Sequence, residues 1–579
     1  MSEEMLLATY HRGVAQTKGL IDLGFTIFQT DDDHIDTNEV APGVWDFSPY
    51  EEQMREVQAL GGRWMFFPHN CFPPKWYRET VPYVRLRCLE HDRTIEAFSI
   101  WEPKAYEYLD RAYEALAEHF GTDPDNIYAF YIGVYGDYGE CQFPAACRIM
   151  YNQDWEKYFG NLHNHYGWWC GDELARRDFR TRMLEKYGAL PALNAAWGTD
   201  WVEAEQIAYP PLDASRRRWY LDFVRWYCDS MERYGRACAE LLRKHFPRQM
   251  LVYPMGAEDE DPRIGQDYSA LVRMAADVGA QVRSTHGGFY RFDANAVSQM
   301  AHLGSACKLY GVPFWTEPQS GIPPHGQVGR IFECLCEGSE AFWDWDSNVT
   351  TPEGGAVIAK YRHLLRKDRP LVEACALFPQ TDHYLHPGQD FPKRYRKLGR
   401  QARVLAHFDV ADEAMIADGA LDAYRFLIHF EGRVFEERTL RRILAWVREG
   451  GVFCLLTDAP LETVEGDTGL YTRELDPGAD PRGAVRRIGK GAVCALRGGE
   501  ADGAAYLAFL RRCLYREPPN GVPLRSIDTG TEQVYGLLYP DGRALVYNMH
   551  RTQTRRIELG GRAYELPPAS ITECGRLPL

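Results

Sequence analysis

Tyr131-Ile-Gly-Val-Tyr-Gly-Asp-Tyr-Gly-Glu140 is the stretch that decides how the first two thirds of this chain are interpreted. Its apolar, aromatic start is typical of a buried strand, and glycines then break the strand. Two acids, Asp137 and Glu140, follow just past its end. In a barrel of alternating strands and helices, catalytic groups stand at the carboxyl ends of the strands. Taken alone, the stretch fits a glycine turn with a solvated acid equally well.

Short apolar runs alternate with amphipathic helical stretches from about residue 20 to residue 350, which indicates a parallel α/β fold. We expect seven strands and, at Glu96–Ile100, either an eighth strand or part of a helix. The seven are 24–29, 63–67, 129–134, 250–253, 280–283, 312–315 and 341–343. Polar residues follow nearly every run, and this favours a (β/α)8 TIM barrel over an open sheet.

Changes in the pattern of predicted strands and helices along the chain indicate the domain organisation. We expect a catalytic barrel over 1–368, with a helical insertion at about 150–215 and a long helix over Arg216–His245. A new strand–helix series begins at 369 and predicts a second α/β domain to about 520. In the last residues, 521–579, apolar and polar positions alternate, and turn signals such as Pro540-Asp-Gly542 separate the alternating runs. This pattern predicts a small β domain.

Composition excludes several classes of function. The 579 residues are 45% hydrophobic and 26% charged, as in soluble globular proteins, and the formal charge of −16 argues against nucleic acid as a partner. No run is long and apolar enough for a membrane span, and the start MSEEMLLATYHRG has no signal-peptide pattern. Fifteen cysteines in so long a chain make no disulfide framework, so we expect a cytoplasmic protein.

A second acid stands in an equivalent place. Val312-Pro-Phe-Trp315 is a short apolar run, and Glu317 follows it before Pro318 and Gly321 end regular structure. Two carboxyls at one barrel mouth are what glycoside hydrolysis needs, one to protonate the leaving oxygen and one to attack or to activate water. The alternative for Glu317 is a structural ion pair with an arginine such as Arg283.

Three further stretches carry a family resemblance. Glu39-Val-Ala-Pro-Gly-Val-Trp-Asp-Phe47 resembles the opening of clan-A glycoside hydrolase barrels. Arg177-Asp-Phe-Arg180 and the residues through Leu221-Asp-Phe223 look like the middle of family 42 β-galactosidases, and 424–456 is similar to that family's flavodoxin-like trimerisation domain. The resemblance implies a TIM barrel with a flavodoxin-like second domain, a small C-terminal β domain and a homotrimer.

Position by position, the resemblance makes Glu140 the acid/base and Glu317 the nucleophile of a retaining enzyme on a β-galactoside or related pyranoside. One position departs from the clan pattern: Gly139 stands where an Asn normally binds the sugar 2-hydroxyl. Asp137 or Asn70 then supplies that contact, or the sugar is held differently. Because a Gly-Glu pair also occurs in inverting β-amylase-type barrels, three alternatives stay open: an inverting hydrolase, a transglycosylase, or a silent carbohydrate-binding barrel.

The remaining candidates are polar or aromatic residues at strand ends, which as a set fit a pocket for a small glycoside or oligosaccharide. Trp315 or Trp343 would form the floor of the sugar subsite, and His286 or Tyr290 would hydrogen-bond the nucleophile. Each is individually as compatible with packing. The substrate-binding set is Asp33, His34, His69, Asn70, Asp137, His286, Tyr290, Trp315, Trp343 and Asp344.

No cofactor or metal is expected. Consecutive acids at Thr30-Asp-Asp-Asp-His34 point in different directions, and Cys334-Leu-Cys336 has the wrong spacing for a zinc knuckle. Cys141 and Cys147 have no matching second pair. The four-cysteine zinc cluster of the resembling family is not recognisable.

Overall fold

The computed structural model describes residues 3–30, 33–34, 38–69, 72–136, 139–143, 165–256, 261–285, 297–387, 393–480, 482–497 and 503–578. For Asp33, His34 and His69 it describes the backbone. The chain divides into two compact units, one of Leu6–Thr285 with Trp343–Thr350 and one of Met1–Met5, His286–Phe342 and Thr351–Leu579.

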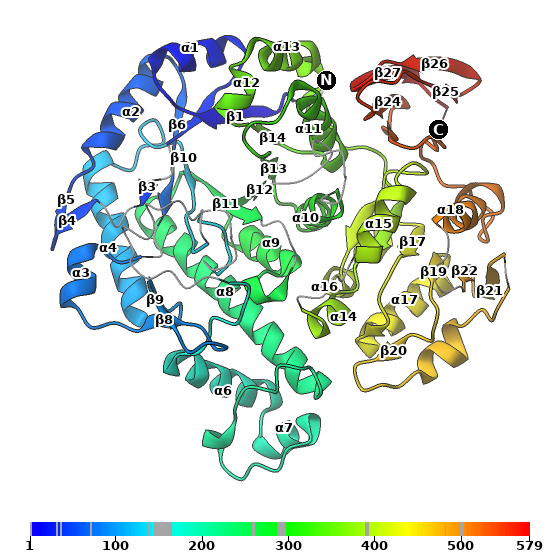
Figure 1. Cartoon of the computed structure of the whole chain (residues 1–579), viewed down its shortest axis with the longest axis horizontal. Helices are drawn as coiled ribbons and strands as arrows, with labels where there is room; N and C mark the ends of the chain where they lie inside the picture. Colours follow the sequence, from blue (N-terminus) through cyan, green and yellow to red (C-terminus); the bar gives the residue numbers. More distant parts are fainter. Residues whose placement is uncertain are drawn as a thin grey trace. The chain divides into compact units, whose positions relative to one another are not determined.

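Eight strands close into a barrel in the order β1-β14-β13-β12-β11-β10-β6-β2 (Figure 1). The pairs are parallel, and Ala129 of β10, for example, lies opposite both Met65 of β6 and Met250 of β11. The strands are β1 Leu6–Tyr10, β2 Ile27–Gln29, β6 Arg63–Phe66, β10 Ala129–Tyr131, β11 Met250–Gly256, β12 Gln281–Thr285, β13 Phe314–Thr316 and β14 Ala341–Trp343. Their residues are almost continuously buried, because a parallel sheet is covered on both faces. The predicted TIM barrel is confirmed.

The eighth strand is not the one expected from the sequence. β1 Leu6–Tyr10 completes the barrel, whereas the expected Glu96–Ile100 is wrong as a barrel strand and as a helix. That segment belongs to β9 Thr94–Phe98, which pairs antiparallel with β8 Arg85–Arg87 in a separate hairpin. The burial of β9 partly alternates, as in a ribbon with one face on the core.

Amphipathic helices connect the barrel strands. α4 Pro103–Phe120 shows the pattern well, because its buried residues recur three or four positions apart from Ala105 to Phe120. The side chain of Glu102 accepts a hydrogen bond from the N–H of Lys104 and caps its start. The other principal helices are α1 Val14–Asp22, α2 Ser48–Ala59, α8 Arg217–His245, α9 Tyr268–Asp277, α10 Val297–Tyr310, α11 Pro324–Glu337 and α13 Pro352–Tyr361.

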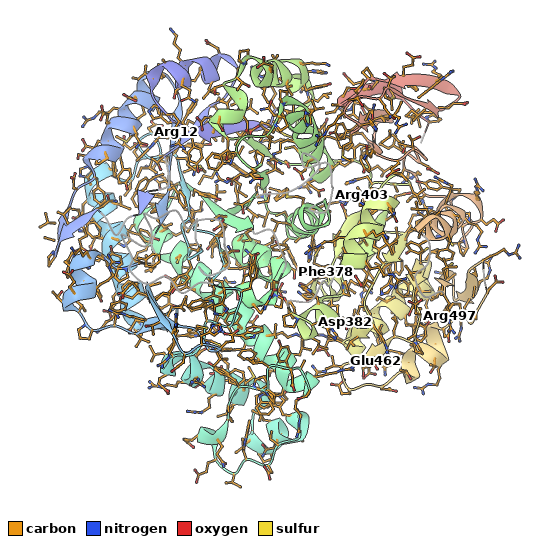
Figure 2. All side chains as sticks on the ribbon, in the orientation of Figure 1. Arg12, Phe378, Asp382, Arg403, Glu462 and Arg497 are labelled. Atoms are coloured by element: carbon orange, nitrogen blue, oxygen red, sulfur yellow. The ribbon has the colours of Figure 1, made fainter. Side chains whose placement is uncertain are left out.

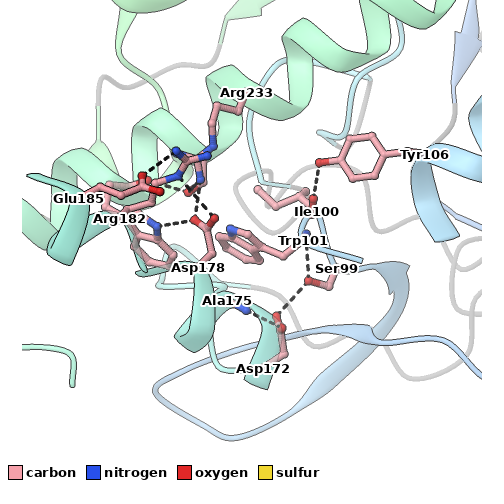
Figure 3. Close-up of polar contacts among 12 residues, drawn as sticks. Ser99, Ile100, Trp101, Tyr106, Asp172, Ala175, Asp178, Arg182, Glu185 and Arg233 are labelled. Atoms are coloured by element: carbon pink, nitrogen blue, oxygen red, sulfur yellow. Dashed lines mark hydrogen bonds and ion pairs between the residues drawn. The ribbon is translucent and has the colours of Figure 1, made fainter. Parts of the chain in front are cut away.

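Two helices of the expected insertion, α6 Glu173–Tyr187 and α7 Leu190–Trp197, pack on α8. The α8 helix matches the predicted Arg216–His245 to within one residue. Asp178 of α6 accepts a 2.6 Å hydrogen bond from Arg233 of α8 (Figure 3). At the start of α6, Asp172 caps the helix at the N–H of Ala175 and also accepts from Ser99, just past β9 (Figure 3).

The α/β region after residue 369 contains a six-stranded sheet in the order β16-β15-β17-β19-β22-β21. Its strands are β15 Ala374–Leu377, β16 Asp409–Ala411, β17 Phe426–His429, β19 Val452–Leu456, β21 Ala484–Ile488 and β22 Gly491–Leu496. The five parallel strands follow the chain order 2-1-3-4-5, with β21 as an antiparallel edge. This is the flavodoxin-like order. The predicted flavodoxin-like fold is confirmed.

Side chains just past β15 hold the carboxyl end of this sheet together. The ring of Phe378, labelled in Figure 2, lies among other aromatic side chains. Its centroid is 5.5 Å from that of His383 and 5.6 Å from that of Tyr395. Asp382 of α14 Gln380–Leu385 accepts a hydrogen bond from the N–H of Arg433.

The C-terminal residues form the small β structure expected from their turns. β23 Val534–Leu538, β24 Arg543–Asn548 and β27 Ser570–Arg576 make a three-stranded antiparallel sheet. β25 Arg555–Leu559 and β26 Arg562–Leu566 form a hairpin whose turn holds Gly560 and Gly561, both at positive φ. Of the helices described in the chain, none has the length and apolarity that a membrane crossing requires.

Candidate active site

Glu140 lies in a tight loop just after β10 and is 3% exposed. The carbonyl oxygen of Glu140 accepts hydrogen bonds from the N–H groups of Tyr135 and Gly136, and the carbonyl of Gly139 accepts from Val134. The N–H of Cys141 donates to the carbonyl of Pro254 in β11. Because the loop is bonded to itself and to the next strand, the backbone that carries the Glu140 carboxyl is fixed.

Two positions of this loop require glycine because neighbouring atoms occupy the space in which a β-carbon would lie. A β-carbon on Gly136 would lie 2.8 Å from Oε2 of Glu140, so the carboxylate uses the space that a side chain would take. Gly139 has φ of +81°, and a β-carbon there would lie 2.8 Å from Cε2 of Phe67 and 3.0 Å from Cα of Gly133. The departure from the clan pattern at position 139 is therefore built into the backbone.

Aromatic residues flank Glu140 along the chain. Tyr135 and Phe143 are fully buried with ring centroids 6.2 Å apart, and Phe143 stacks on Tyr227 at 4.4 Å. Tyr138 lies outside the described residues. Burial raises the pKa of the neighbouring Cys141 thiol well above its ordinary value, so Cys141 stays neutral and is a poor nucleophile.

Glu317 directly follows β13 and is 6% exposed. The preceding Thr316 hydroxyl lies 2.7 Å from Sγ of Cys334 in α11, which fixes the strand end against that helix. In the sheet, Thr316 pairs with Phe342 of β14. After Glu317 the chain turns at Gly321, which has φ of +72°, and enters α11. The geometry places Glu317 where the sequence predicted it.

Three of the predicted pocket residues come together on neighbouring backbone segments. β3 Asp33–His34 pairs in parallel with β7 Pro68–His69, so His34 lies opposite His69. These two short strands follow β2 and β6, which are neighbours in the barrel.

The predicted aromatic residues Trp315 and Trp343 are both fully buried. The Trp343 ring packs edge-on to Tyr10 with centroids 5.0 Å apart. Asp344 is also fully buried, and its carboxylate accepts a 2.7 Å hydrogen bond from Asn348. Their role in binding a sugar stays a prediction. Asn70, Asp137, His286 and Tyr290 lie outside the described residues.

The stacking of Arg283 inside the barrel was missed from the sequence, which offered this arginine only as a possible ion-pair partner of Glu317. The Arg283 guanidinium of β12 lies 3.5 Å from the ring centroid of Tyr131 in β10 and 4.3 Å from that of Trp343 in β14. Its Nη1 donates a 2.6 Å hydrogen bond to Gln29 of β2. None of these strands neighbours β12, so the contacts cross the barrel interior. Two aromatic rings and the Gln29 amide, all of them neutral, thereby hold the Arg283 guanidinium in place.

A second group missed from the sequence is Cys88, His91 and His165, whose potential ligand atoms all lie within 4.8 Å of one another. Its one sequence signal is the Cys-x-x-His spacing of residues 88 to 91.

Comparison with known proteins places the barrel region in a family context. Residues 37–274 match the model of glycoside hydrolase family 42, described as beta-galactosidase. The thermophilic beta-amylase of Thermoanaerobacterium thermosulfurigenes is 26% identical over 212 residues, 32% of this chain. The match covers 35% of that enzyme, so the chain spans about a third of this curated relative.

Solved structures extend the likeness to the whole fold. A beta-galactosidase from Halorubrum lacusprofundi superimposes with a TM-score of 0.74 and 15% identity, covering 99% of each chain. The catalytic domain of the beta-amylase from Paenibacillus polymyxa superimposes with a TM-score of 0.52 and 17% identity, covering 63% of this chain and 98% of that domain.

Proposed function

We propose that this family 42-like chain is a glycoside hydrolase that removes a terminal β-linked sugar, a β-galactoside or a related pyranoside. The observation that carries the proposal is the placement of Glu140 and Glu317, each buried and each just past a barrel strand, β10 and β13. Support comes from the match of residues 37–274 to a family described as beta-galactosidase.

In the proposed mechanism, Glu140 is the acid/base and Glu317 the nucleophile. Glu140 donates a proton to the glycosidic oxygen while a Glu317 oxygen attacks the anomeric carbon, and the bond to the aglycone breaks. Glu140, now ionised, takes a proton from water, whose oxygen displaces Glu317 and releases the sugar with its configuration retained. The predicted pocket residues, among them Asp33, His69 and Trp343, would bind the sugar hydroxyls and ring.

A panel of aryl β-glycosides tests the proposal. We expect hydrolysis of at least one, and Glu317→Gln and Glu140→Gln to lower kcat by about a hundredfold to ten-thousandfold. Glu340→Gln is the matched control, because Glu340 precedes β14 and so lies at the opposite end of a barrel strand. Undiminished activity in Glu317→Gln would overturn the assignment. Inactivity of the wild type with retained sugar binding would favour the silent binding barrel.

A second candidate, inversion, is favoured by Gly139 and by the beta-amylase relatives. An inverting enzyme uses one acid and one base about 6.5–9.5 Å apart, with water between the base and the sugar. Proton NMR of the first-formed anomer separates the two mechanisms. A β-anomer supports double displacement, and an α-anomer from a β-glycoside supports inversion. A sugar–sugar product formed with an added acceptor indicates transglycosylation.

We further propose that the protein is a cytoplasmic homotrimer, as its family resemblance implies. Light scattering coupled to size-exclusion chromatography tests the assembly. A mass of three times the 66.4 kDa chain is expected, and the monomer mass would contradict it.

A further inference from the structure

Cys88, His91 and His165 converge on one small volume outside the proposed active-site loop. Sγ of Cys88 lies 2.9 Å from Nε2 of His165 and 3.6 Å from Nδ1 of His91. The two histidine nitrogens lie 3.1 Å apart. Ligands bound tetrahedrally to Zn²⁺ at about 2.3 Å for sulfur and 2.0–2.1 Å for nitrogen are themselves about 3.3–3.6 Å apart. The Cys88–His91 and His91–His165 separations are therefore within about 0.3 Å of metal-bound values, and the Cys88–His165 separation would have to open by about 0.6 Å on binding.

The local backbone fixes two of the three donors. Cys88-Leu-Glu-His91 forms the turn between β8 and β9, where the N–H of Cys88 donates to the carbonyl of Arg93. The N–H of His91 points to Sγ of Cys88 at 3.4 Å. Cys88 is buried and His91 is exposed, so solvent can reach the site from one side.

Neighbouring groups also orient the third donor, His165. Its Nδ1 lies 3.0 Å from the carbonyl oxygen of Tyr166. A carbonyl accepts only from an N–H, so this contact assigns the proton to Nδ1 and leaves the Nε2 lone pair directed at Cys88 and His91. Metal-bound histidines commonly show this arrangement of the second ring nitrogen.

Glu90 holds the two segments together next to the donors. Its carboxylate accepts from the N–H of Trp168 at 2.9 Å, and the N–H of Leu89 donates to the carbonyl of Trp168 at 2.7 Å. Its Oε2 also lies 3.4 Å from Sγ of Cys88. Glu90 is thus engaged with backbone, and a fourth metal position would be filled by water or by a shift of this carboxylate.

We propose that Cys88, His91 and His165 bind one Zn²⁺ ion, which pins residues 165–172 to the β8–β9 hairpin. Thiolate and imidazole donors select zinc over Mg²⁺ or Ca²⁺, which prefer oxygen. The other end of the same segment is already tied to this hairpin, because Asp172 accepts from Ser99 (Figure 3). The metal would tie the His165 end of these residues to the hairpin. Its role is therefore structural and independent of the proposed glycosidase chemistry.

Metal analysis of the full chain, purified without an affinity tag, tests the proposal. After incubation with ZnCl₂ and desalting, elemental analysis should find one zinc per chain. His165→Gln and Cys88→Ser should each lower the zinc content at least tenfold. His119→Gln is the matched control, because His119 pairs with Glu51 on the barrel surface and should keep the full zinc content.

A second readout does not depend on the folding of the variants. Wild-type protein loaded with Co²⁺ should show the thiolate-to-cobalt charge-transfer band and tetrahedral visible bands, and chelation should abolish these bands and lower the thermal stability. Wild-type protein that binds no zinc above background overturns the proposal. Full zinc binding in Cys88→Ser, or a cobalt spectrum without thiolate bands, equally assigns the metal elsewhere.

Discussion

The ring of Phe67 occupies the space in which a side chain on Gly139 would begin. A β-carbon at residue 139 would lie 2.8 Å from Cε2 and 2.9 Å from Cζ of that ring, at a backbone φ of +81°. Phe67 is 2% exposed and packs edge-on to Tyr131 of β10 with centroids 4.8 Å apart, so it cannot move without disturbing the barrel. An Asn before Glu140 would therefore clash with Phe67, and we expect the proposed enzyme to hold its sugar by other groups.

Gly139→Asn is expected to destabilise the protein and to abolish turnover, because the new side chain displaces Phe67 and with it the loop of Glu140. Overpacking of this kind costs about 1–3 kcal/mol. Gly188→Asn is the matched control: Gly188 has φ of +72° with nothing within 4 Å of its β-carbon, so that variant should unfold within a few degrees of wild type. Wild-type activity in Gly139→Asn would contradict the packing argument.

Arg283→Lys is expected to lower the free energy of unfolding by about 2–4 kcal/mol, because an ammonium group cannot reproduce the stacked guanidinium inside the barrel. Arg63→Lys serves as control. Arg63 also lies over a tyrosine ring, that of Tyr128 at 4.7 Å, but it is exposed and should change stability by about 1 kcal/mol or less. Urea unfolding followed by tryptophan fluorescence compares them. Equal effects of the two substitutions would show that burial of Arg283 is not decisive.

His407 predicts a loss of stability in mild acid. Burial, together with the nearby Arg403 and Lys308 cations, lowers its pKa from 6.5 to about 3, while Asp409 opposes the shift. Nη1 of Arg403 donates to Nδ1 of the neutral ring at 2.8 Å. Below about pH 6.5 the unfolded chain protonates this histidine, whereas the folded chain keeps it neutral down to about pH 3. The free energy of unfolding therefore falls by about 1.4 kcal/mol per pH unit between pH 6.5 and pH 3.

His407→Gln keeps an acceptor for Arg403 and removes the titration. Between pH 7.5 and pH 5 the variant should therefore lose about 2 kcal/mol less than wild type in denaturant unfolding. Between pH 7.5 and pH 8.5 the histidine is neutral in the folded and the unfolded chain, and the difference between the two proteins should stay constant. Parallel stability curves across the acid range would rule out His407 as the titrating group.

Seven barrel strands could be predicted because strands buried on both faces appear as uninterrupted apolar runs, such as Phe314–Thr316. Leu6–Tyr10 was missed because it stands alone before the first helix, and its pairing with Ile27–Gln29 is set only in the closed barrel. The alternation in Thr94–Phe98 was the signal that it is a hairpin strand. Sequence patterns report local burial, so they locate individual strands more reliably than they show which strands pair to close the barrel.

Some residues of the candidate site could likewise be predicted from local sequence pattern, and others could not. Glu140 and Glu317 could be placed from sequence because Glu317 directly follows β13 and Glu140 lies in the loop that follows β10. Arg283 stacks between residues of two strands that are not its neighbours, and Cys88 meets His165 from 77 residues away. Such contacts depend on three-dimensional closure, and no spacing rule in one sequence reveals them.

The helices of the insertion depend on one buried acid, Asp222 of α8. This fully buried carboxylate accepts hydrogen bonds from Nζ of Lys186 at 2.6 Å and from Nε1 of Trp197 at 2.8 Å. The hydroxyl of Tyr187 donates to it as well. Donors from α6 and α7 thus meet on a single side chain of the long helix.

Asp222→Asn is expected to release α6 and α7 from α8, because an amide has one acceptor oxygen for three donors and leaves Lys186 without its counter-ion. The carboxylate is buried but Lys186 is 41% exposed, so the loss is expected to cost about 1–3 kcal/mol, the range for leaving a buried donor unsatisfied. Hydrogen exchange measured by mass spectrometry should accelerate over 173–197 while the barrel strands stay protected. Asp178→Asn is the control: its carboxylate is 24% exposed and joins the same two elements through Arg233, so it should cost about 1 kcal/mol or less. Unchanged exchange over 173–197 in Asp222→Asn would mean that apolar packing alone holds these helices.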